Sequence, residues 1–185
     1  MGDRRVDLVC HPDAPCPEVR GLQVRVGMQD AHTLVLSYDL RGDLERLSIP
    51  GLGVPQRSDR LWERTCFEVF LKVLEGTDYR EFNFSPSRAW ATYAFRDYRE
   101  GGAPIEGVNP LIFVRQGPDQ LQLDVILHLD EGLFPQSRRL LRMGLSAVIE
   151  RQDGSRSYWA IRHPHGRPDF HHADAYTLEL DTGWD

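Results

Sequence analysis

Alternation of apolar and polar residues is the feature that most constrains what this chain of 185 residues can fold into. In the segment QLQLDVILHLD, which begins at Gln120, every second residue from Leu121 to Leu129 is apolar. Successive side chains of a strand point to opposite faces, so this spacing predicts a strand with one face on a core. The same spacing recurs along the chain and predicts strands at 22–26, 34–40, 61–73, 79–84, 89–95, 111–115, 120–130, 144–150, 157–161 and 176–180.

Turn residues separate these segments at hairpin spacing. The segments QGPDQ (116–120) and RQDGS (151–155) lie between alternating runs, and Gly and Asp adopt the backbone angles that tight turns need. The only helical signal is a short one at 135–141. About nine to eleven short strands with little helix predict an all-β fold, an antiparallel β-sandwich of the immunoglobulin-like or jelly-roll type.

Composition narrows the function classes. A chain of this length with 41% hydrophobic residues can build one core, so we expect a single domain over 1–185. Its net charge of −6 argues against nucleic-acid binding, which needs an excess of Lys and Arg. The sequence shows no apolar run of membrane-spanning length and no signal-peptide pattern. We therefore expect a cytoplasmic protein without a nucleic-acid or membrane partner, while its oligomeric state stays open.

Two rarer residue types add smaller inferences. Lys72 is the only lysine among 22 basic residues, a bias that is typical of a GC-rich bacterial genome. The three cysteines, Cys10, Cys16 and Cys66, are an odd number without metal-type spacing. They indicate reduced thiols rather than a disulfide framework or a zinc site.

Four segments carry a resemblance to a known family: RTCFEVFL, YREFNFSPSRAWATYAFRDYREGG, GLSAVIE and YWAIRHPHGRPDFHHADAYTLEL. Together they resemble the DOMON-like β-sandwich family, in a cytoplasmic branch. That family is related to carbohydrate-binding module family nine and to the sandwich that carries haem b in some extracellular cytochromes. The resemblance extends from CHPDAPCPEV to YTLEL and implies a ligand-binding sandwich. It does not set the ligand, because relatives on one fold bind different molecules.

The sugar-binding relatives imply the first function, a non-catalytic module that binds a carbohydrate or a sugar derivative. Sugars are held by aromatic rings on their apolar faces and by polar groups on their hydroxyls. The candidate ligand-binding residues are Trp62, Arg64, Glu68, Asn83, Trp90, Tyr93, Arg99, Trp159, His163 and His171, with Tyr158 as a further ring. Each ring could instead pack in the core, and Arg64 with Glu68 could form a solvated ion pair. We expect Arg64 and Glu68 to be at least partly accessible in a shared depression beside an aromatic ring.

An enzyme is the alternative class, most plausibly a sugar-processing hydrolase. Such an enzyme would show two carboxyl groups about 5 to 9 Å apart in a cleft, whereas a binding module would show one concave face with clustered rings and no strongly perturbed carboxylate pair. The sequence assigns no catalytic residue, because it does not show which carboxylates meet. The candidates are Glu63, Glu68, Glu81, Asp124 and Glu150. A purely structural interaction domain would instead show a flat apolar patch or a long unprotected edge strand.

Haem b is the one cofactor that the resemblance brings into question; otherwise we expect none. The cytochrome relatives hold the iron between a methionine and a histidine. The available methionines are Met28 and Met143, and a pair of Met28 with His163 or His171 is conceivable. A single methionine in a turn-like or apolar segment is more typical of packing.

Four of the seven histidines lie in the segment HPHGRPDFHH, residues 163–172, called the histidine loop below. Pro164, Gly166 and Pro168 exclude a regular helix and interrupt any strand, so the histidines lack the spacing with which a rigid element presents zinc ligands. We predict an ordered loop at the rim of the ligand pocket and not a structural metal site. Phe170 is expected to anchor the loop and Asp169 to accept hydrogen bonds that hold its turn.

Overall fold

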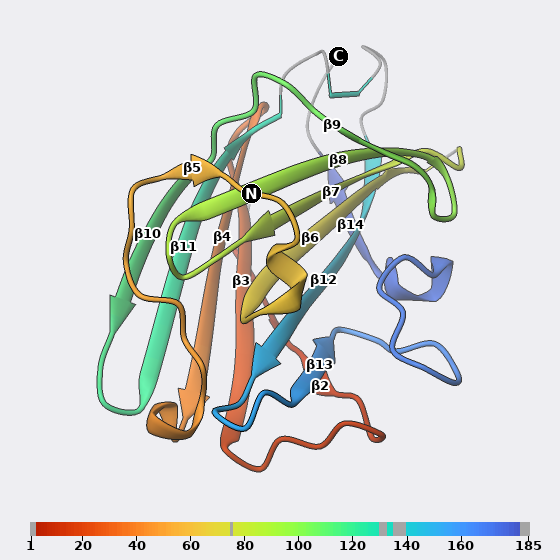
Figure 1. The fold of residues 1–185 in the computed structure, drawn as a ribbon. Helices are drawn as coiled ribbons and strands as arrows, with labels where there is room; N and C mark the ends of the chain where they lie inside the picture. The colour runs from red at the N-terminus through yellow and green to blue at the C-terminus, as the bar shows by residue number, and fades with distance from the viewer. Residues whose placement is uncertain (1–2, 75, 130–132, 135–139, 182–185) are drawn as a thin grey trace.

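The protein folds into two β-sheets packed face to face, as the computed structural model in Figure 1 shows. The structure describes residues 3–74, 76–129, 133–134 and 140–181. Within this part, every ladder between named strands is antiparallel except that between β5 and β8. The predicted fold class, an antiparallel β-sandwich with little helix, is confirmed.

The small sheet has five strands in the described part of the chain. Their spatial order is β1 (Arg4–Asp7), β3 (Val19–Asp30), β4 (Thr33–Gly42), β11 (Gln120–His128) and β10 (Leu111–Gln116). Strand β10 ends the sheet at one edge, and its residues Leu111 and Phe113 are exposed.

The large sheet has nine strands among the described residues. Its main path is β2 (Val9–Cys10), β13 (Arg156–Ala160), β12 (Leu140–Glu150), β6 (Cys66–Val73), β7 (Tyr79–Phe84), β8 (Ala89–Asp97) and β5 (Gln56–Arg57). Off this path, β14 (Leu178–Asp181) pairs with β12 and β9 (Glu100–Pro104) pairs with β8. The helical turns of the described chain are the short 3-10 elements η1 (Leu44–Arg46), η2 (Leu61–Glu63) and η3 (Ala173–Ala175).

The core lies between the sheets and follows the alternation in the sequence. On β11, Leu121, Leu123, Val125 and Leu127 are fully buried, as the period of two predicts. On β6, Phe67, Val69 and Leu71 point to the same core. The remaining residues of β6 therefore face outward, and Glu68 and Phe70 are among them. The outer face of the large sheet is where the polar and aromatic residues of β6 and β7 meet.

The predicted turns are confirmed and two predicted element boundaries shift. QGPDQ connects β10 to β11, and RQDGS connects β12 to β13 with Gly154 at φ +81. The strand expected from residue 61 begins at Cys66, because 61–63 form η2. Of the helical signal at 135–141, residues 135–139 lie outside the described residues, while Leu140 and Leu141 begin β12.

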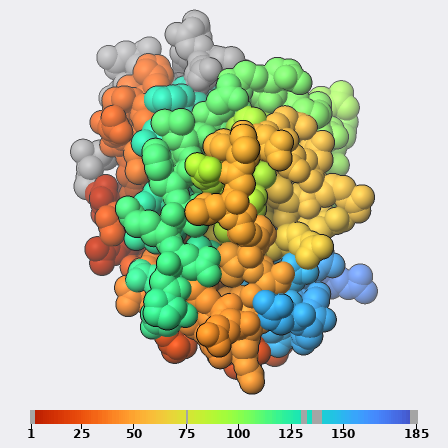
Figure 2. All heavy atoms as spheres, turned by 60° about the vertical axis from the view of Figure 1, so that its left-hand side comes forward, coloured from red at the N-terminus to blue at the C-terminus, as the bar shows by residue number. Residues whose placement is uncertain are grey.

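The segment from residue 48 to 60 runs along the molecular surface beside β8 (Figure 2). The backbone N–H of Gly53 donates to the carbonyl of Ser87, and β5 pairs with the start of β8. This segment leads directly into η2, so it fixes where Trp62 sits over the large sheet. Within the described residues, we find no helix with the length and apolar character of a membrane span.

Candidate ligand-binding pocket

A cavity of about 440 Å³ opens on the outer face of the large sheet. It is bounded by strands β6, β7, β8, β12 and β13, by η2, by the β8–β9 hairpin and by the histidine loop. Its lining residues are Trp62, Glu68, Phe70, Glu81, Tyr93, Phe95, Arg99, Gly102, Val148, Arg156, Tyr158, Pro168, Phe170 and His171. Buried carboxyl groups and several aromatic rings thus face one concave space.

Strand register brings the floor of this pocket together. Phe70 on β6 lies opposite Glu81 on β7, and Glu81 lies opposite Tyr93 on β8. The three side chains form a row across neighbouring strands on one face, because directly opposed residues of antiparallel strands point the same way. Glu68 lies two residues before Phe70 on β6 and therefore faces the same space as Glu81.

The two floor carboxyl groups are almost completely buried, with Glu68 at 2% and Glu81 at 5% exposure. The Ser146 hydroxyl donates to Glu68 Oε2 at 3.0 Å, and Asn83 Nδ2 donates to Glu81 Oε1 at 2.7 Å. Burial, and then repulsion from Glu81, raises the pKa of Glu68; burial also raises the pKa of Glu81. The floor therefore holds two carboxyl groups whose ionised forms are both disfavoured.

His171 and Phe95 form one wall, and Tyr79 packs against both. The Tyr79 ring stacks on Phe95 with centroids 4.6 Å apart, and the His171 ring meets the Phe95 ring edge-on at 5.1 Å. Tyr79 Oη and His171 Nδ1 are 2.8 Å apart, and His171 Nε2 lies 3.8 Å from Glu81 Oε2. Burial lowers the pKa of His171 to about 4, so its ring is neutral at neutral pH.

Trp62 and Tyr93 form the opposite wall. Their ring centroids are 5.8 Å apart in an edge-on arrangement, and the Tyr93 hydroxyl donates to Asp59 Oδ1 at 2.7 Å. Arg60 adopts a left-handed backbone, with φ +63, at the start of η2. That turn carries Trp62 over the sheet, where its side chain stays partly exposed. A partly exposed ring beside a second ring is a suitable surface for the apolar face of a ligand.

Asp169 ties the histidine loop to the β8–β9 hairpin. Its carboxylate accepts hydrogen bonds from Arg99 Nη2 at 2.9 Å, from the Tyr98 hydroxyl and from the His171 backbone N–H at 3.1 Å. Burial alone would raise the pKa of Asp169, but the bonds from Tyr98 and Arg99 outweigh it and the pKa is lowered. Asp169 accepts a backbone hydrogen bond, as the sequence predicted, and joins two segments of the pocket wall.

Five residues that the sequence selected as ligand-binding candidates line this one cavity, and five do not. Those that line it are Trp62, Glu68, Tyr93, Arg99 and His171. The loop contributes through Pro168, Phe170 and His171, at the position that the sequence analysis expected for it. Their role in binding a ligand stays a prediction.

Arg64 does not join Glu68, and Glu68 is buried instead of partly accessible, so the expected shared depression is wrong in both respects. Its guanidinium lies 3.4 Å from Glu150 Oε2, and the arginine side chain is 68% exposed. Because Arg64 precedes β6 and follows η2, the alternation of β6 does not extend to it. The aromatic neighbours of Glu68 in the cavity include Phe70 and Trp62 instead.

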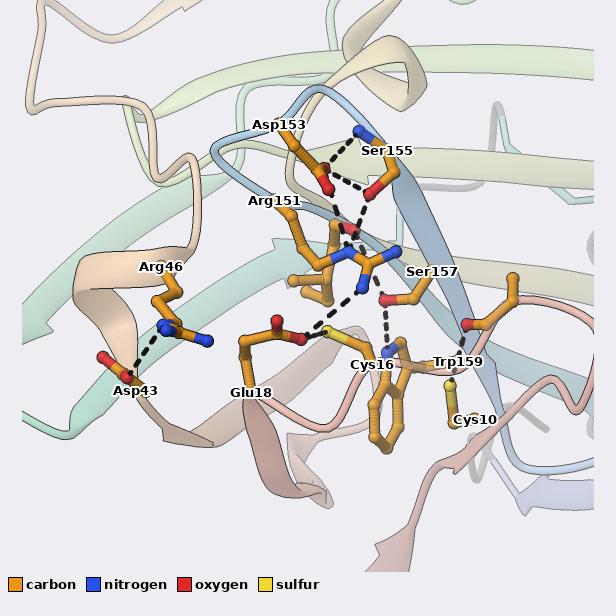
Figure 3. A network of polar contacts seen from close by, with 12 residues as sticks. Cys10, Cys16, Glu18, Asp43, Arg46, Arg151, Asp153, Ser155, Ser157 and Trp159 are labelled. Carbon is orange, nitrogen blue, oxygen red and sulfur yellow. Dashed lines mark hydrogen bonds and ion pairs between the residues drawn. The ribbon is translucent and has the colours of Figure 1, made fainter.

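Trp90 and Trp159 point away from the pocket, which corrects their selection. Both pack against the core between the sheets, and the Trp159 indole N–H donates to Ser157 Oγ at 2.9 Å (Figure 3). The adjacent residue Tyr158 faces the cavity in its place, since neighbouring side chains of a strand alternate. Figure 3 shows the Trp159 ring next to Cys16, in a polar network that includes Arg151.

Asn83 and His163 are also outside the lining. Asn83 is fully buried on the pocket face, opposite Glu68, and it bonds to Glu81 rather than to backbone. His163 bonds through Nε2 to the carbonyl of Val9 at 2.8 Å and packs edge-on against His11. Asn83 thus holds the floor residue Glu81 in place, and His163 attaches the start of the histidine loop to β2.

Phe70 and Phe95 are the main lining residues that the sequence analysis did not name. Tyr158 was named as a further ring, Phe170 as the anchor of the loop, and Glu81 only as a candidate carboxylate of the enzyme alternative. The sequence does indicate that Glu81 lies on the outer face of its strand, because it alternates with Phe82 and Phe84, whose side chains are in the core. The pairing of β7 with β6, which sets Glu81 beside Phe70, needs the strand register and is not visible in the sequence.

The described residues contain no group of three or more His, Cys, Asp or Glu that could hold a metal ion. His172 accepts the backbone N–H of Asp174 and caps η3, while His165 is exposed. Met28 lines a separate cavity of about 30 Å³, so it does not share the cavity of His171 as the haem alternative required. His163, the other histidine of that alternative, is bonded to backbone.

Cys10, Cys16 and Cys66 are free thiols, as the sequence predicted. Cys66 is fully buried in β6, and burial raises its pKa well above the usual range for a thiol. A thiol held in its protonated form is a poor nucleophile. These geometries assign Cys66 to packing.

Comparison with known proteins identifies the fold. No family model and no curated sequence matches the chain. A candidate carbohydrate-binding protein from Bacteroides uniformis matches with a TM-score of 0.68 at 15% identity, over 98% of this chain and 86% of that one. A family 9 carbohydrate-binding module from Caldicellulosiruptor kristjanssonii, solved with cellotriose, matches with a TM-score of 0.54 at 10% identity, over 95% of this chain and 82% of that one. The chain shares their β-sandwich fold.

Proposed function

We propose that the protein is a non-catalytic module that binds a small carbohydrate in the cavity on the large sheet. The observation that carries this proposal is the pairing of ring walls with a polar floor in one cavity of about 440 Å³. Rings cover the apolar faces of a sugar while carboxyl and amide groups bond its hydroxyls, and a cavity of this size fits a small ligand.

The fold likeness supports the same function. The two solved structures are described as a candidate carbohydrate-binding protein and as a family 9 module in complex with cellotriose. At 15% and 10% identity the likeness concerns the fold, so the sugar-binding role of this chain rests on its own pocket residues. Trp62 and Tyr93 are the ring pair, and Glu81, which lies opposite Tyr93 on the neighbouring strand, is a floor group beside them.

Titration of the full chain with glucose and cellotriose, followed by calorimetry and tryptophan fluorescence, tests the proposal. Saturable binding is expected, and Trp62→Ala should weaken it about tenfold because the stacking surface is removed. Phe113→Ala is the matched control, since Phe113 is an exposed ring on the small sheet. Its affinity should equal that of the unaltered chain. Absence of binding to these sugars, or equal affinities for Trp62→Ala and the control, contradicts the proposal.

Glycoside hydrolysis is a second candidate, favoured by one observation. Glu68 and Glu81 line the same cavity, and the pKa of each is raised, as a general acid requires. Incubation with chromogenic aryl glycosides tests it. Product release that is lost in both Glu68→Gln and Glu81→Gln, but kept in Glu150→Gln, would establish hydrolysis and displace the non-catalytic role.

We also propose that the chain is a cytoplasmic member of the DOMON-like family. The support is the set of sequence segments described above, which resemble a cytoplasmic branch of that family. Cell fractionation of the source organism, with the protein detected by antibody, tests the location. Recovery in the soluble cytoplasmic fraction is expected, and recovery from the exterior contradicts it.

A further inference from the structure

The floor of the pocket carries two acidic side chains, Glu68 and Glu81, that have no arginine or lysine partner within the described residues. Their hydrogen-bond donors are the neutral Ser146 hydroxyl and the neutral Asn83 amide. Buried carboxylates are ordinarily paired with a cation, because an isolated buried charge is costly. The protein alone leaves this pair uncompensated.

His171 does not supply the missing charge. The backbone N–H of Arg99 donates to Tyr79 Oη at 3.1 Å, and we assign the Tyr79 hydroxyl as the donor in its 2.8 Å contact with His171 Nδ1, an arrangement that satisfies both contacts. The proton of the neutral imidazole then resides on Nε2, 3.8 Å from Glu81 Oε2. His171 therefore presents a neutral N–H towards Glu81, and its lowered pKa is consistent with this state.

The arginines of the pocket lie at its mouth. Arg99 forms an ion pair with Asp169 at 2.9 Å and its side chain is half exposed, so its charge only partly offsets the rise that burial causes in the pKa of Glu81. Arg156 stands at the start of β13 and is exposed to solvent. Charges in contact with water are screened, whereas buried charges act at full strength. A positive group on a ligand would thus be drawn past the mouth to the floor.

Two further features favour a cation at the floor. Asn83 Oδ1 is a buried acceptor without a hydrogen-bond partner among the described residues, and it lies beside Glu81 and opposite Glu68. The cavity is lined by aromatic rings, including Phe70 and Tyr93, whose faces attract cations. Acceptors and ring faces together match an ammonium group, which has three donors and no acceptor.

We propose that the preferred ligand is a sugar bearing a primary amino group, a hexosamine, held with its ammonium on Glu68 and Glu81. This inference rests on the proposed sugar-binding function and adds the chemical class of the sugar. The ring of the sugar would lie against Trp62 and Tyr93, and its amino group would replace the proton that the carboxyl pair otherwise retains. A neutral hexose would leave the pair uncompensated.

Calorimetric titration of the full chain at about pH 7 with glucosamine, glucose and N-acetylglucosamine tests the inference. These probes share one ring and differ in an ammonium, a hydroxyl and a neutral amide. Glucosamine should bind about tenfold more tightly than either of the others, since only it compensates the buried pair. Glu81→Gln should bring the ratio of glucosamine to glucose affinity to about one. Glu150→Gln, a buried carboxyl group paired with Arg64, should keep the ratio.

The outcomes separate this inference from the proposed function. Binding of glucose at an affinity equal to or above that of glucosamine overturns the amino-sugar preference and leaves sugar binding intact. A preference that persists in Glu81→Gln and in Glu68→Gln also overturns it, because the ammonium would then be recognised elsewhere. Absence of binding to all three probes, and to cellotriose, overturns both.

Discussion

The hydroxyl of Tyr38, on the small sheet, donates a hydrogen bond of 2.8 Å to the backbone carbonyl of Glu68, on the large sheet. Tyr38 is fully buried, so this bond crosses the core and fixes the strand segment whose side chain enters the pocket from the other face. Buried hydrogen bonds between sheets specify one relative position of the layers, whereas apolar contacts tolerate shifts. This bond therefore fixes the backbone of the pocket floor from the core side of the large sheet.

Tyr38→Phe is expected to lower the free energy of unfolding by about 1 to 2 kcal/mol, because it deletes a buried hydrogen bond while keeping the ring. Urea unfolding followed by fluorescence measures this change. Tyr158→Phe is the matched control, since Tyr158 is half-buried and its hydroxyl forms no hydrogen bond among the described residues, so its change should stay within about 0.5 kcal/mol. Equal effects of the two substitutions would show that the bond across the core contributes nothing.

Stability should fall as pH rises, because of the carboxyl pair. The pKa of Glu68 is raised to about 8 and that of Glu81 to about 7, from an ordinary 4.5. Above the ordinary value the unfolded chain releases protons that the folded chain keeps, so this contribution is full below about pH 4.5 and is lost by about pH 8. The pKa of His171 is lowered from 6.5 to about 4 and acts in the opposite direction, but only below about pH 6.5.

Urea unfolding at about pH 6.5 and about pH 8, on the unaltered chain and on Glu68→Gln, isolates the carboxyl contribution, because the small remaining histidine contribution is common to both. The unaltered chain should lose stability over this interval, with a slope of at most about 1.4 kcal/mol per pH unit for each proton. Glu68→Gln removes one of the two titrating groups and leaves Glu81 titrating with a pKa of about 7, so its loss of stability over this interval should be about half that of the unaltered chain or less. An unchanged slope in this variant would contradict the assignment of the pair.

Two adjacent residues of β13 should separate stability from binding. Trp159→Phe removes buried volume and the indole bond to Ser157, so it should cost about 2 kcal/mol of stability and leave sugar affinity unchanged. Tyr158→Ala changes a half-buried residue of the cavity wall and should weaken sugar binding about fivefold. Thermal unfolding and calorimetry on both variants provide the measurements. The assignment fails if Trp159→Phe is the variant with impaired binding.

From the sequence, the residues of the site could be predicted only within single strands, by which face of the strand each side chain is on. The period of two placed Glu68 on the outer face of β6, because Phe67, Val69 and Leu71 mark the inner face. The same rule failed on β13, where Tyr158 and Trp159 are both aromatic and either could have been the inner residue. In the structure the larger ring, Trp159, packs in the core between the sheets. The space that the small sheet leaves for this ring is not visible in the sequence.

Relations between strands were beyond the sequence pattern. Glu81 meets Phe70 and Tyr93 because of the register of β7 with its two neighbours, and register is set by tertiary packing. Arg64 was assigned by extending the alternation of β6 backward into a segment that turns as η2. The fold class was predictable because it depends on the number and spacing of alternating segments, which the sequence displays directly.

A pair of glycines offers a test of the backbone packing that supports both sheets. A Cβ on Gly42, at the end of β4, would collide with the backbone carbonyl of Glu18, which cannot rotate away. Gly42→Ala should therefore cost about 2 kcal/mol or more. Gly21→Ala is the control, since nothing lies within 4 Å of a Cβ there. Its stability should be equal or slightly higher, and chemical unfolding of both variants decides the matter.

The bond between Arg99 and Asp169 joins residues that are 70 positions apart in the sequence. The chain between them includes β9 to β13 and so contributes strands to both sheets. Closing a loop of this length before those strands are paired would cost entropy without any compensating contact. We therefore expect this wall of the pocket to form at the end of folding, after the sheets that support it. In a refolding experiment, recovery of ligand affinity should lag behind recovery of β-structure.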